Sequence, residues 1–303
     1  MRDAFIRALT ELAEADERIV LVTGDLGFGV LEDFARRFPG RFINAGVAEQ
    51  NMTAIACGMA LEGYQVYTYS IGNFPTLRCL EQIRNDVCYH DADVKVVSVG
   101  GGFSYGQLGM SHFATEDLAI MRALPNMTVV APSDPWEAAA LTRQMSARRG
   151  PAYLRLDKSA AGLPEEPVTL GCARQVREGG DVCLIATGGI VEEALKAADL
   201  LAADGFAASV FAVNTIKPLD PVLVAAAGAA KAVIVIEEHT VIGGLGSAVA
   251  EACMTAGVVP PRFLRIGLDD IYPTVVGDQR YLRKVYELDA DAIARRTKAL
   301  LER

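Results

Sequence analysis

The sequence predicts an α/β protein of two domains, each a mostly parallel sheet flanked by helices. Short runs rich in β-branched residues alternate with longer stretches that carry apolar residues at helical spacing. This alternation stops once, around residues 161–175, where Gly and Pro recur without periodicity, and then resumes. A chain of 303 residues is long enough for two domains of ordinary size. We therefore expect one domain over residues 1–160, a linker over 161–175 and a second domain over 176–303.

The first domain is predicted from five strands and four helices. The predicted strands are residues 18–23, 65–70, 94–99, 128–131 and 152–156, and the predicted helices are 3–15, 49–61, 77–89 and 134–148. In the last helix Ser133 can cap the start, and Pro135 suits the first turn, where its missing N–H is not needed. Strands that alternate with helices imply parallel pairing with helices on both faces of the sheet.

The second domain repeats the alternation. Its predicted strands are residues 181–187, 207–213, 232–237 and 263–266, and its predicted helices are 191–203, 246–256 and 290–302. This half is therefore also expected to form a parallel sheet between helices.

The composition excludes some classes of partner and site. The net charge of −9 argues against binding to a nucleic-acid backbone or an anionic membrane surface, although a local arginine pocket could still bind a phosphorylated metabolite. No apolar run reaches membrane-spanning length. The six cysteines form no Cys-x-x-Cys pair, which argues against a zinc or redox motif. Reduced thiols and the early acidic residues fit a cytoplasmic protein.

Glu49 is the main catalytic candidate. Residues 45–53 read Ala-Gly-Val-Ala-Glu-Gln-Asn-Met-Thr, and Glu49 stands where a predicted helix begins. A carboxylate there is often only a partner of the helix dipole. The whole string, however, resembles the glutamate motif of thiamine-diphosphate enzymes of the transketolase type, which include deoxyxylulose-phosphate synthase and the β subunits of 2-oxoacid dehydrogenases.

This resemblance covers nearly the whole chain. It implies a pyrimidine-binding domain with the thiamine-diphosphate-binding fold, followed by a transketolase C-terminal domain. It also implies that Glu49 hydrogen-bonds a ring nitrogen of the cofactor's aminopyrimidine. A carboxyl group in that place favours the tautomer whose imino group removes a proton from the reactive carbon, and it works best when buried.

Three further residues are expected near the cofactor. Phe74 follows the second predicted strand, where relatives have an aromatic ring that stacks on the pyrimidine. The alternative is a loop aromatic that covers core. Ile71 stands where relatives often have another aromatic, and it could form a wall of the pocket. Asp25 follows the first predicted strand, and the resemblance places it near the cofactor where two subunits meet, with turn capping as the alternative.

The segment 105–118 resembles the transketolase segment whose histidine contacts a substrate oxygen and assists proton transfer, and His112 is the matching residue. Its surroundings depart from the family pattern. Leu108 replaces an aspartate that reads a substrate hydroxyl, Gly100 replaces a histidine near the phosphate, and Gly29 replaces a phosphate-contacting serine. Losing polar groups should weaken the preference for hydroxylated, phosphorylated substrates. An unusual acceptor, such as a modified or nucleotide-linked sugar, therefore stays open.

Two arginines match phosphate-binding positions of the family. Arg155 lies at the end of a predicted strand, where it could bind an anion. Arg2 lies at the start of the first helix, and its alternative is a solvated charge. A glycine-rich segment at 243–247 follows Glu237 and His239, but its spacing is not that of a dinucleotide loop. It resembles the family's C-terminal domain, and we expect a structural role for it.

The sequence contains no Gly-Asp-Gly, the motif with which related enzymes bind the diphosphate and Mg²⁺. The resemblance implies thiamine diphosphate and Mg²⁺ as cofactors. We therefore expect a separate N-terminal transketolase subunit to carry that motif and the metal ligands. Two copies of each chain would form a heterotetramer, with a homodimeric contact inside it.

The sequence thus predicts one subunit of a split transketolase. Such an enzyme transfers a two-carbon ketol unit from a ketose donor to an aldehyde acceptor, with sugars or sugar phosphates as substrates. One alternative is the β subunit of a 2-oxoacid dehydrogenase, although residues 124–134 fit transketolase and deoxyxylulose-phosphate synthase better. Another is a non-catalytic scaffold, which the substitutions at Leu108 and Gly100 favour and the retained Glu49 and Phe74 oppose.

Overall fold

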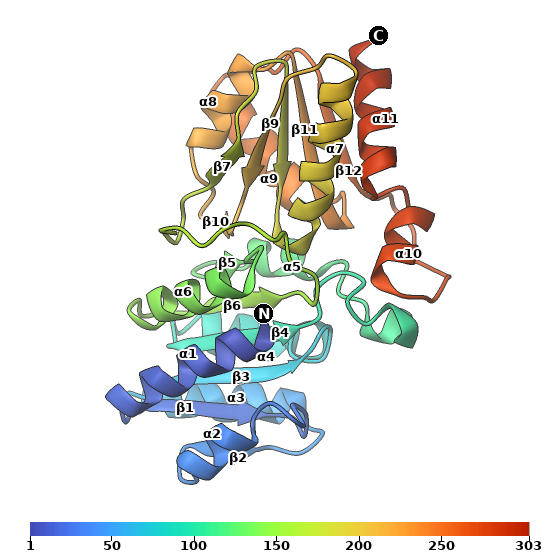
Figure 1. The fold of residues 1–303 in the computed structure, drawn as a ribbon. Helices are drawn as coiled ribbons and strands as arrows, with labels where there is room; N and C mark the ends of the chain where they lie inside the picture. Colours follow the sequence, from blue (N-terminus) through green and yellow to red (C-terminus); the bar gives the residue numbers. More distant parts are fainter. Residues whose placement is uncertain (303) are drawn as a thin grey trace.

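A computed structural model describes residues 1–302 as two α/β domains stacked on each other (Figure 1). Each domain contains one sheet with helices on both faces, so the predicted fold class is confirmed. Between β6 and β7, which end and begin at residues 156 and 174, the chain has neither helix nor strand. This segment overlaps the predicted linker over residues 161–173.

The first sheet has seven strands. They are β1 (Ile19–Thr23), β2 (Phe42–Asn44), β3 (Gln65–Ile71), β4 (Val94–Val99), β5 (Thr128–Val130), β6 (Ala152–Leu156) and β10 (Thr215–Lys217), in the spatial order β10-β5-β6-β4-β3-β1-β2. All neighbours pair in parallel except β10 and β5. Because β10 comes from the second half of the chain, the two halves share this sheet.

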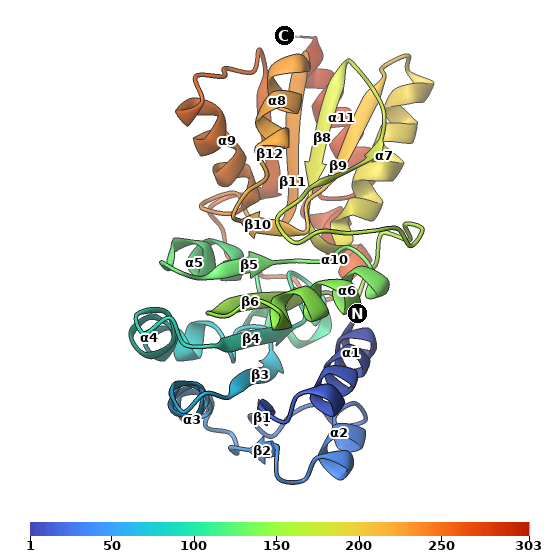
Figure 2. The same ribbon diagram turned by 90° about the vertical axis from the view of Figure 1, so that its left-hand side faces the viewer.

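Helices cover both faces of the first sheet. On one side lie α1 (Arg2–Ala15), α2 (Glu32–Arg37) and α6 (Pro135–Ser146), and on the other lie α3 (Glu49–Leu61), α4 (Leu80–Gln82) with a π-helical turn (Ile83–Cys88), and α5 (Asp117–Ala123) (Figure 2). Alternation along the strands produces this division, since successive side chains point to opposite faces. In β1, Leu21 shares a buried cluster with Phe5 of α1, whereas Val22 shares one with Met52 of α3.

The second sheet has five strands. They are β7 (Arg174–Arg177), β8 (Val182–Ala186), β9 (Ala208–Ala212), β11 (Ala232–Thr240) and β12 (Phe263–Leu268), in the order β12-β11-β8-β9-β7. Only β7, against β9, is antiparallel. One face carries α7 (Val191–Ala203) and α11 (Ala290–Leu301), and the other carries α8 (Val222–Ala229) and α9 (Leu245–Thr255) (Figure 2). The short helix α10 (Gln279–Val285) lies beside the first domain (Figure 1).

The differences from the predicted elements concern short segments. The elements that were not predicted are α2, α5, α8, α10, β2, β7 and β10. Strand β7 begins inside the residues expected to form the linker. Segments of three to eight residues show too few turns or alternations for their periodicity to be read. The predicted helix over 77–89 is instead a 3₁₀ turn (Leu77–Cys79), α4 and the π-helical turn. Other 3₁₀ turns are Gly106–Leu108, Met110–His112 and Gly188–Ile190.

Buried polar groups join the two domains. Glu238, in β11, accepts hydrogen bonds from the backbone N–H of Phe103 at 2.6 Å and from Nε2 of Gln279 at 2.8 Å, and it forms an ion pair with Arg283. Its backbone oxygen accepts a bond from Nη2 of Arg155 in the first sheet at 2.9 Å. Each charge is compensated, which makes burial at this interface tolerable.

No helix among residues 1–302 is long and apolar enough to cross a membrane. All six cysteines, each within that range, have free thiols.

We predict that Glu238→Ala lowers the free energy of unfolding by about 3–5 kcal/mol, because the substitution removes the buried ion-pair partner of Arg283 Nε and the acceptor of the buried Phe103 N–H. Equilibrium denaturation would measure this loss. Glu251→Ala is the matched control, since Glu251 forms an ion pair with Arg122 across the same two domains but is 65% exposed. The control should change stability by less than about 1 kcal/mol. Equal effects of the two variants would contradict the prediction.

Candidate active site

The carboxyl edge of the first sheet brings the candidate residues together. Asp25 follows β1, Glu49 follows β2, Phe74 follows β3, His112 lies in the loop after β4, and Lys158 follows β6. Because these strands run parallel, their carboxyl ends meet at the same edge of the sheet. Residues up to 133 positions apart in sequence therefore lie around one site.

Glu49 is the first residue of α3 and is only 3% exposed. Its Oε1 accepts a hydrogen bond from Nη1 of Arg78 at 2.9 Å. The loop after β1 approaches the carboxylate closely at Gly24, where a Cβ atom would lie 3.2 Å from Cγ of Glu49. A larger residue at position 24 would therefore crowd the glutamate. The sequence analysis did not identify Arg78, which lies in a 3₁₀ turn outside any periodic pattern.

Phe74 and His112 are neighbours. Their ring centroids lie 5.2 Å apart with an interplanar angle of 65°, so one ring meets the other edge-on. Asn73 ties the two loops together, since its Nδ2 donates to the backbone oxygen of Phe113. Ser111 Oγ lies 2.9 Å from Nδ1 of His112. Partial burial lowers the pKa of His112, so this imidazole is neutral near pH 7 and can either donate or accept a hydrogen bond.

Asp25 and Ile71 occupy the rim of the site. Asp25 is exposed and has a φ of 58°, in the left-handed region that Asp adopts more readily than most residues. Its Oδ1 accepts a bond from Nδ2 of Asn44 at 2.8 Å, and its N–H donates to the Asn44 side chain at 3.0 Å. These bonds connect the loop after β1 to the last residue of β2, in keeping with the alternative of a turn-forming role. Ile71 is half-buried at the end of β3.

Arg155 does not lie with these residues. It is 3% exposed, its Nη2 donates to the backbone of Glu238, and its Nε lies 3.7 Å from Asp117 Oδ2 and 3.6 Å from Asp157 Oδ1. The expectation that Arg155 binds a substrate anion does not fit this geometry, because its guanidinium is enclosed between the two domains. Burial raises the pKa of Asp157, which is one of the two carboxyls beside it.

Lys158 is the cation that the sequence analysis missed. Its Nζ lies 3.6 Å from the ring centroid of Tyr105, and both burial and the nearby charge of Arg2 lower the pKa of its amine. Two cations close enough for the charge of one to lower the pKa of the other favour an anion near them. Lys158 lies in an irregular stretch between a predicted strand and the expected linker. Its position just after the strand is the only sequence feature that could have identified it as a site residue. Arg2 is half-exposed and also lies 3.3 Å from Asp3.

The positions that depart from the family pattern also lie here. Gly100 has a φ of 97°, and a Cβ atom there would lie 2.2 Å from the ring of Tyr105. The tyrosine ring therefore takes the space that a side chain at position 100 would need. The side chain of Leu108 is 56% exposed beside this ring. Gly29, with a φ of 75°, is exposed in the loop after β1.

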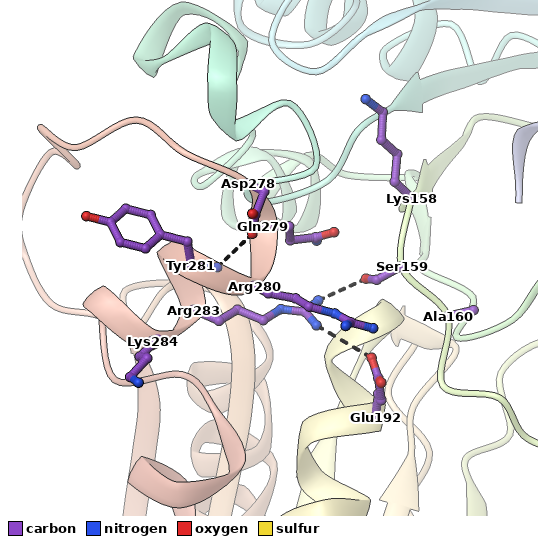
Figure 3. Close-up of a pocket in the computed structure, with 10 residues that line it drawn as sticks. All are labelled: Lys158, Ser159, Ala160, Glu192, Asp278, Gln279, Arg280, Tyr281, Arg283 and Lys284. Carbon is purple, nitrogen blue, oxygen red and sulfur yellow. Dashed lines mark hydrogen bonds and ion pairs between the residues drawn. The ribbon is translucent and has the colours of Figure 1, made fainter.

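Two cavities meet at Lys158. The smaller has a volume of about 310 Å³ and is lined by Ser104, Tyr105, Gly106, Gln107, Leu108, Lys158, Asp278 and Gln279. The larger, of about 650 Å³, opens between α10, α7 and the segment 158–160 (Figure 3). In that cavity Arg283 is held by Ser159 Oγ at 2.9 Å and by Glu192 at 4.0 Å (Figure 3). The smaller cavity borders the loop that carries His112.

In the second domain, the segment expected to be structural has that role. The carboxylate of Glu237 accepts bonds from the backbone N–H groups of Leu245 at 2.7 Å and Gly246 at 2.9 Å, at the start of α9. His239 is fully buried, and its Nε2 accepts a bond from the N–H of Ala119 at 3.3 Å. Because protein groups already use these helix N–H donors, the segment does not offer them to a nucleotide phosphate.

Comparisons with known proteins agree with this arrangement. Residues 1–164 match the family model described as the transketolase pyrimidine-binding domain, and residues 171–293 match the transketolase C-terminal domain. The chain belongs to the transketolase family. It is a transketolase-type chain made of the pyrimidine-binding and C-terminal domains, and these matches support the transketolase interpretation over the 2-oxoacid dehydrogenase alternative.

Several relatives of this transketolase chain are single subunits of similar length. It is 38% identical over 308 residues to a 6-deoxy-6-sulfo-D-fructose transketolase subunit of Clostridium sp. strain MSTE9, covering 100% of this chain and 95% of the relative. It is 33% identical over 300 residues to one subunit of an apulose-4-phosphate transketolase from Phocaeicola vulgatus, covering 97% and 95%.

A solved structure is also similar. The structure described as a split gene transketolase in an inactive β4 tetramer matches this chain with a TM-score of 0.87 and 36% identity, covering 99% of this chain and 97% of the other. The transketolase chain therefore corresponds to one subunit of a split enzyme.

The site suits the aminopyrimidine of thiamine diphosphate. The flat guanidinium of Arg78 donates an N–H bond to the buried carboxylate of Glu49 and also contacts the aromatic face of Phe74. A planar heterocycle with ring nitrogens likewise needs a hydrogen-bonding partner for a nitrogen and an aromatic face to stack on. Among residues 1–302, no three His, Cys, Asp or Glu side chains are grouped so that they could hold a metal ion.

We predict that the ring-proton NMR shifts of His112 titrate with a midpoint below 6.5, because burial disfavours the charged imidazole. A His112→Gln variant would assign the signal. The unfolded chain binds this proton more tightly than the folded chain, so the contribution of His112 to stability is present above pH 6.5 and falls as the pH drops below that value. A midpoint at or above 6.5 would contradict the assigned environment.

Proposed function

We propose that this chain is the C-terminal subunit of a thiamine-diphosphate-dependent transketolase. With its partner it would transfer a two-carbon ketol unit from a ketose donor to an aldehyde acceptor. The observation that carries the proposal is the placement of the buried Glu49 carboxylate at the sheet edge, where Arg78 links it to the neighbouring rings of Phe74 and His112. A simple helix-dipole role would not require these groups to converge on one planar ligand.

Each residue has a distinct proposed role. When bound, thiamine diphosphate would supply the nucleophilic carbon that this chemistry requires. Glu49 accepts a hydrogen bond from the pyrimidine ring and fixes its tautomer. Phe74 covers a ring face and excludes water there. His112 contacts the substrate oxygen and holds or gives a proton at that atom.

Asp25 and Ile71 complete the cofactor side of the proposed site. Ile71 supplies an apolar wall at the end of β3, while Asp25 fixes the loop after β1 to the end of β2 at the boundary with the partner. The diphosphate and Mg²⁺ would bind to the Gly-Asp-Gly motif of the N-terminal subunit. We propose a heterotetramer with two copies of each chain, in the cytoplasm.

We further propose a sugar with an anionic group as the substrate. Lys158 and Arg2 form the cationic side of the site, and the adjoining cavity of about 310 Å³ has room for such a group. Leu108 and Gly100 provide no polar side chain to read hydroxyls, which favours a non-standard sugar. Two relatives are named for a sulfonated and a phosphorylated sugar, each anionic.

We predict that Glu49→Gln lowers kcat by about 100-fold or more in the complex with the N-terminal subunit, because the amide cannot act as the carboxylate does in general acid–base chemistry. Product formation from a panel of ketoses and aldehydes would measure it. Glu62→Gln, an exposed position just after the same helix, is the control and should keep full activity. Near wild-type turnover in Glu49→Gln, with the partner bound, would refute the assignment.

We predict that Lys158→Met raises KM for anionic sugars by about tenfold, since it removes one charge-assisted contact. The KM for the corresponding neutral sugar should not change, because no anion is there to be bound. Lys284→Met, an exposed lysine on the larger cavity, serves as the control for loss of one positive charge. An equal rise in KM for neutral and anionic sugars would show that Lys158 does not bind the anionic group.

A further inference from the structure

Arg78 makes two contacts that are unusual for one partly exposed side chain. Its Nη1 donates to the carboxylate of Glu49 at 2.9 Å, and its guanidinium carbon lies 4.3 Å from the ring centroid of Phe74. The side chain of Arg78 is 46% exposed, whereas that of Glu49 is only 3% exposed. A solvent-accessible cation thus reaches in to the two groups that are proposed to hold the cofactor ring.

These contacts are the same in kind as those expected from the aminopyrimidine. A guanidinium is planar, donates N–H bonds to a carboxylate, and stacks on aromatic faces. A pyrimidine ring nitrogen that hydrogen-bonds Glu49 while the ring lies on Phe74 would need the same carboxylate and the same aromatic face. Two planar groups cannot both lie there.

We propose that Arg78 is an internal occupant of the pyrimidine position, which cofactor binding must displace. The proposal rests on the proposed function of the site. In the chain by itself, the guanidinium compensates the buried carboxylate and covers the aromatic ring. The cofactor takes over both contacts, and the arginine side chain moves out to solvent.

The local structure allows the side chain to move while the backbone stays in place. Arg78 lies in the 3₁₀ turn Leu77–Cys79, and the residues around it are anchored. Cys79 is buried with its Sγ 3.2 Å from the backbone oxygen of Phe74, and Thr76 Oγ1 donates to the backbone oxygen of Gly72 at 3.1 Å. The exchange therefore needs only rotamer changes of one half-exposed side chain, which are fast compared with ligand binding.

The arrangement has a physical purpose. An ionised carboxylate as buried as that of Glu49 is costly without a partner, and without the cofactor no other charged side chain is paired with it among the described residues. Arg78 supplies that partner. This arrangement lowers the affinity for the cofactor, because the Arg78–Glu49 ion pair and the Arg78–Phe74 cation–π contact must be broken before the cofactor binds.

An opposite role for Arg78 is that it stays in place and orients Glu49 while the cofactor is bound. The two roles differ in sign. Removing an occupant strengthens cofactor binding, whereas removing a support weakens it. The affinity for the cofactor, measured apart from turnover, therefore decides between them.

The test is calorimetric titration of thiamine diphosphate with Mg²⁺ into the complex, with the N-terminal subunit at saturating concentration. Arg78→Ala should bind the cofactor roughly tenfold more tightly than the wild-type chain. Arg84→Ala is the matched control, because Arg84 is an exposed arginine six residues later whose Nη1 bonds the neighbouring Asn85 side chain at 2.6 Å. It should bind as the wild type does. Unchanged or weaker binding by Arg78→Ala would overturn the proposal.

A double-mutant cycle on the isolated chain gives a second test, because it measures the coupling free energy between Arg78 and Glu49. Unfolding of wild type, Arg78→Ala, Glu49→Gln and the double variant should show a favourable coupling between the two residues, and independent effects would overturn the proposal. The outcomes separate this proposal from the proposed function. A wild-type complex that binds no thiamine diphosphate refutes both, whereas normal binding by the wild type without tightening in Arg78→Ala refutes only the role of Arg78.

Discussion

The parallel pairing of the strands in the first sheet is the constraint that makes the site possible. Each strand ends at the same edge, so each following loop delivers its side chains there. Glu49 comes from the β2 connection, Phe74 from the loop after β3 and His112 from the loop after β4. An antiparallel arrangement would have sent alternate loops to opposite edges and separated these groups. The one antiparallel neighbour, β10, lies at the far end of the sheet from β1 and β2, where it does not disturb this convergence.

Compensation of buried charge organises the molecule in two places. At the domain interface, Glu238 is satisfied by Arg283 and by neighbouring donors, so the second domain is held to the first by groups that cannot be exposed or removed singly without cost. At the site, Glu49 is satisfied by Arg78, which is half-exposed and free to leave. The arginine of the Glu238–Arg283 pair is buried, which fits a fixed structural role. The arginine of the Glu49–Arg78 pair is half-exposed, which fits the proposed replacement by a ligand.

On the proposed substrate side of the site, Tyr105 determines the surroundings of both Gly100 and Lys158. Tyr105 fills the space beside Gly100 and contacts the amine of Lys158, whose pKa is lowered by burial and by the charge of Arg2. The proposed site thus has positive charge but no polar side chain at positions 100 and 108. This combination agrees with a transketolase chain whose relatives include enzymes named for unusual anionic sugars. The chemistry at the cofactor would be kept and the recognition of the sugar altered.

The amino-acid sequence alone was enough to predict the two α/β domains, the long strands and helices, the helix that begins at Glu49 and the position of Phe74 just after a strand. Periodic burial leaves a readable pattern over many residues, and the glutamate motif is local. The surroundings of the charged side chains, in contrast, emerged only from the folded chain. Arg155 and Lys158 lie three residues apart on one strand and its loop, yet one is enclosed between the domains and the other reaches the site. Arg78 and the shared strand β10 were likewise invisible, because contacts between residues distant in the chain depend on packing that no local pattern records.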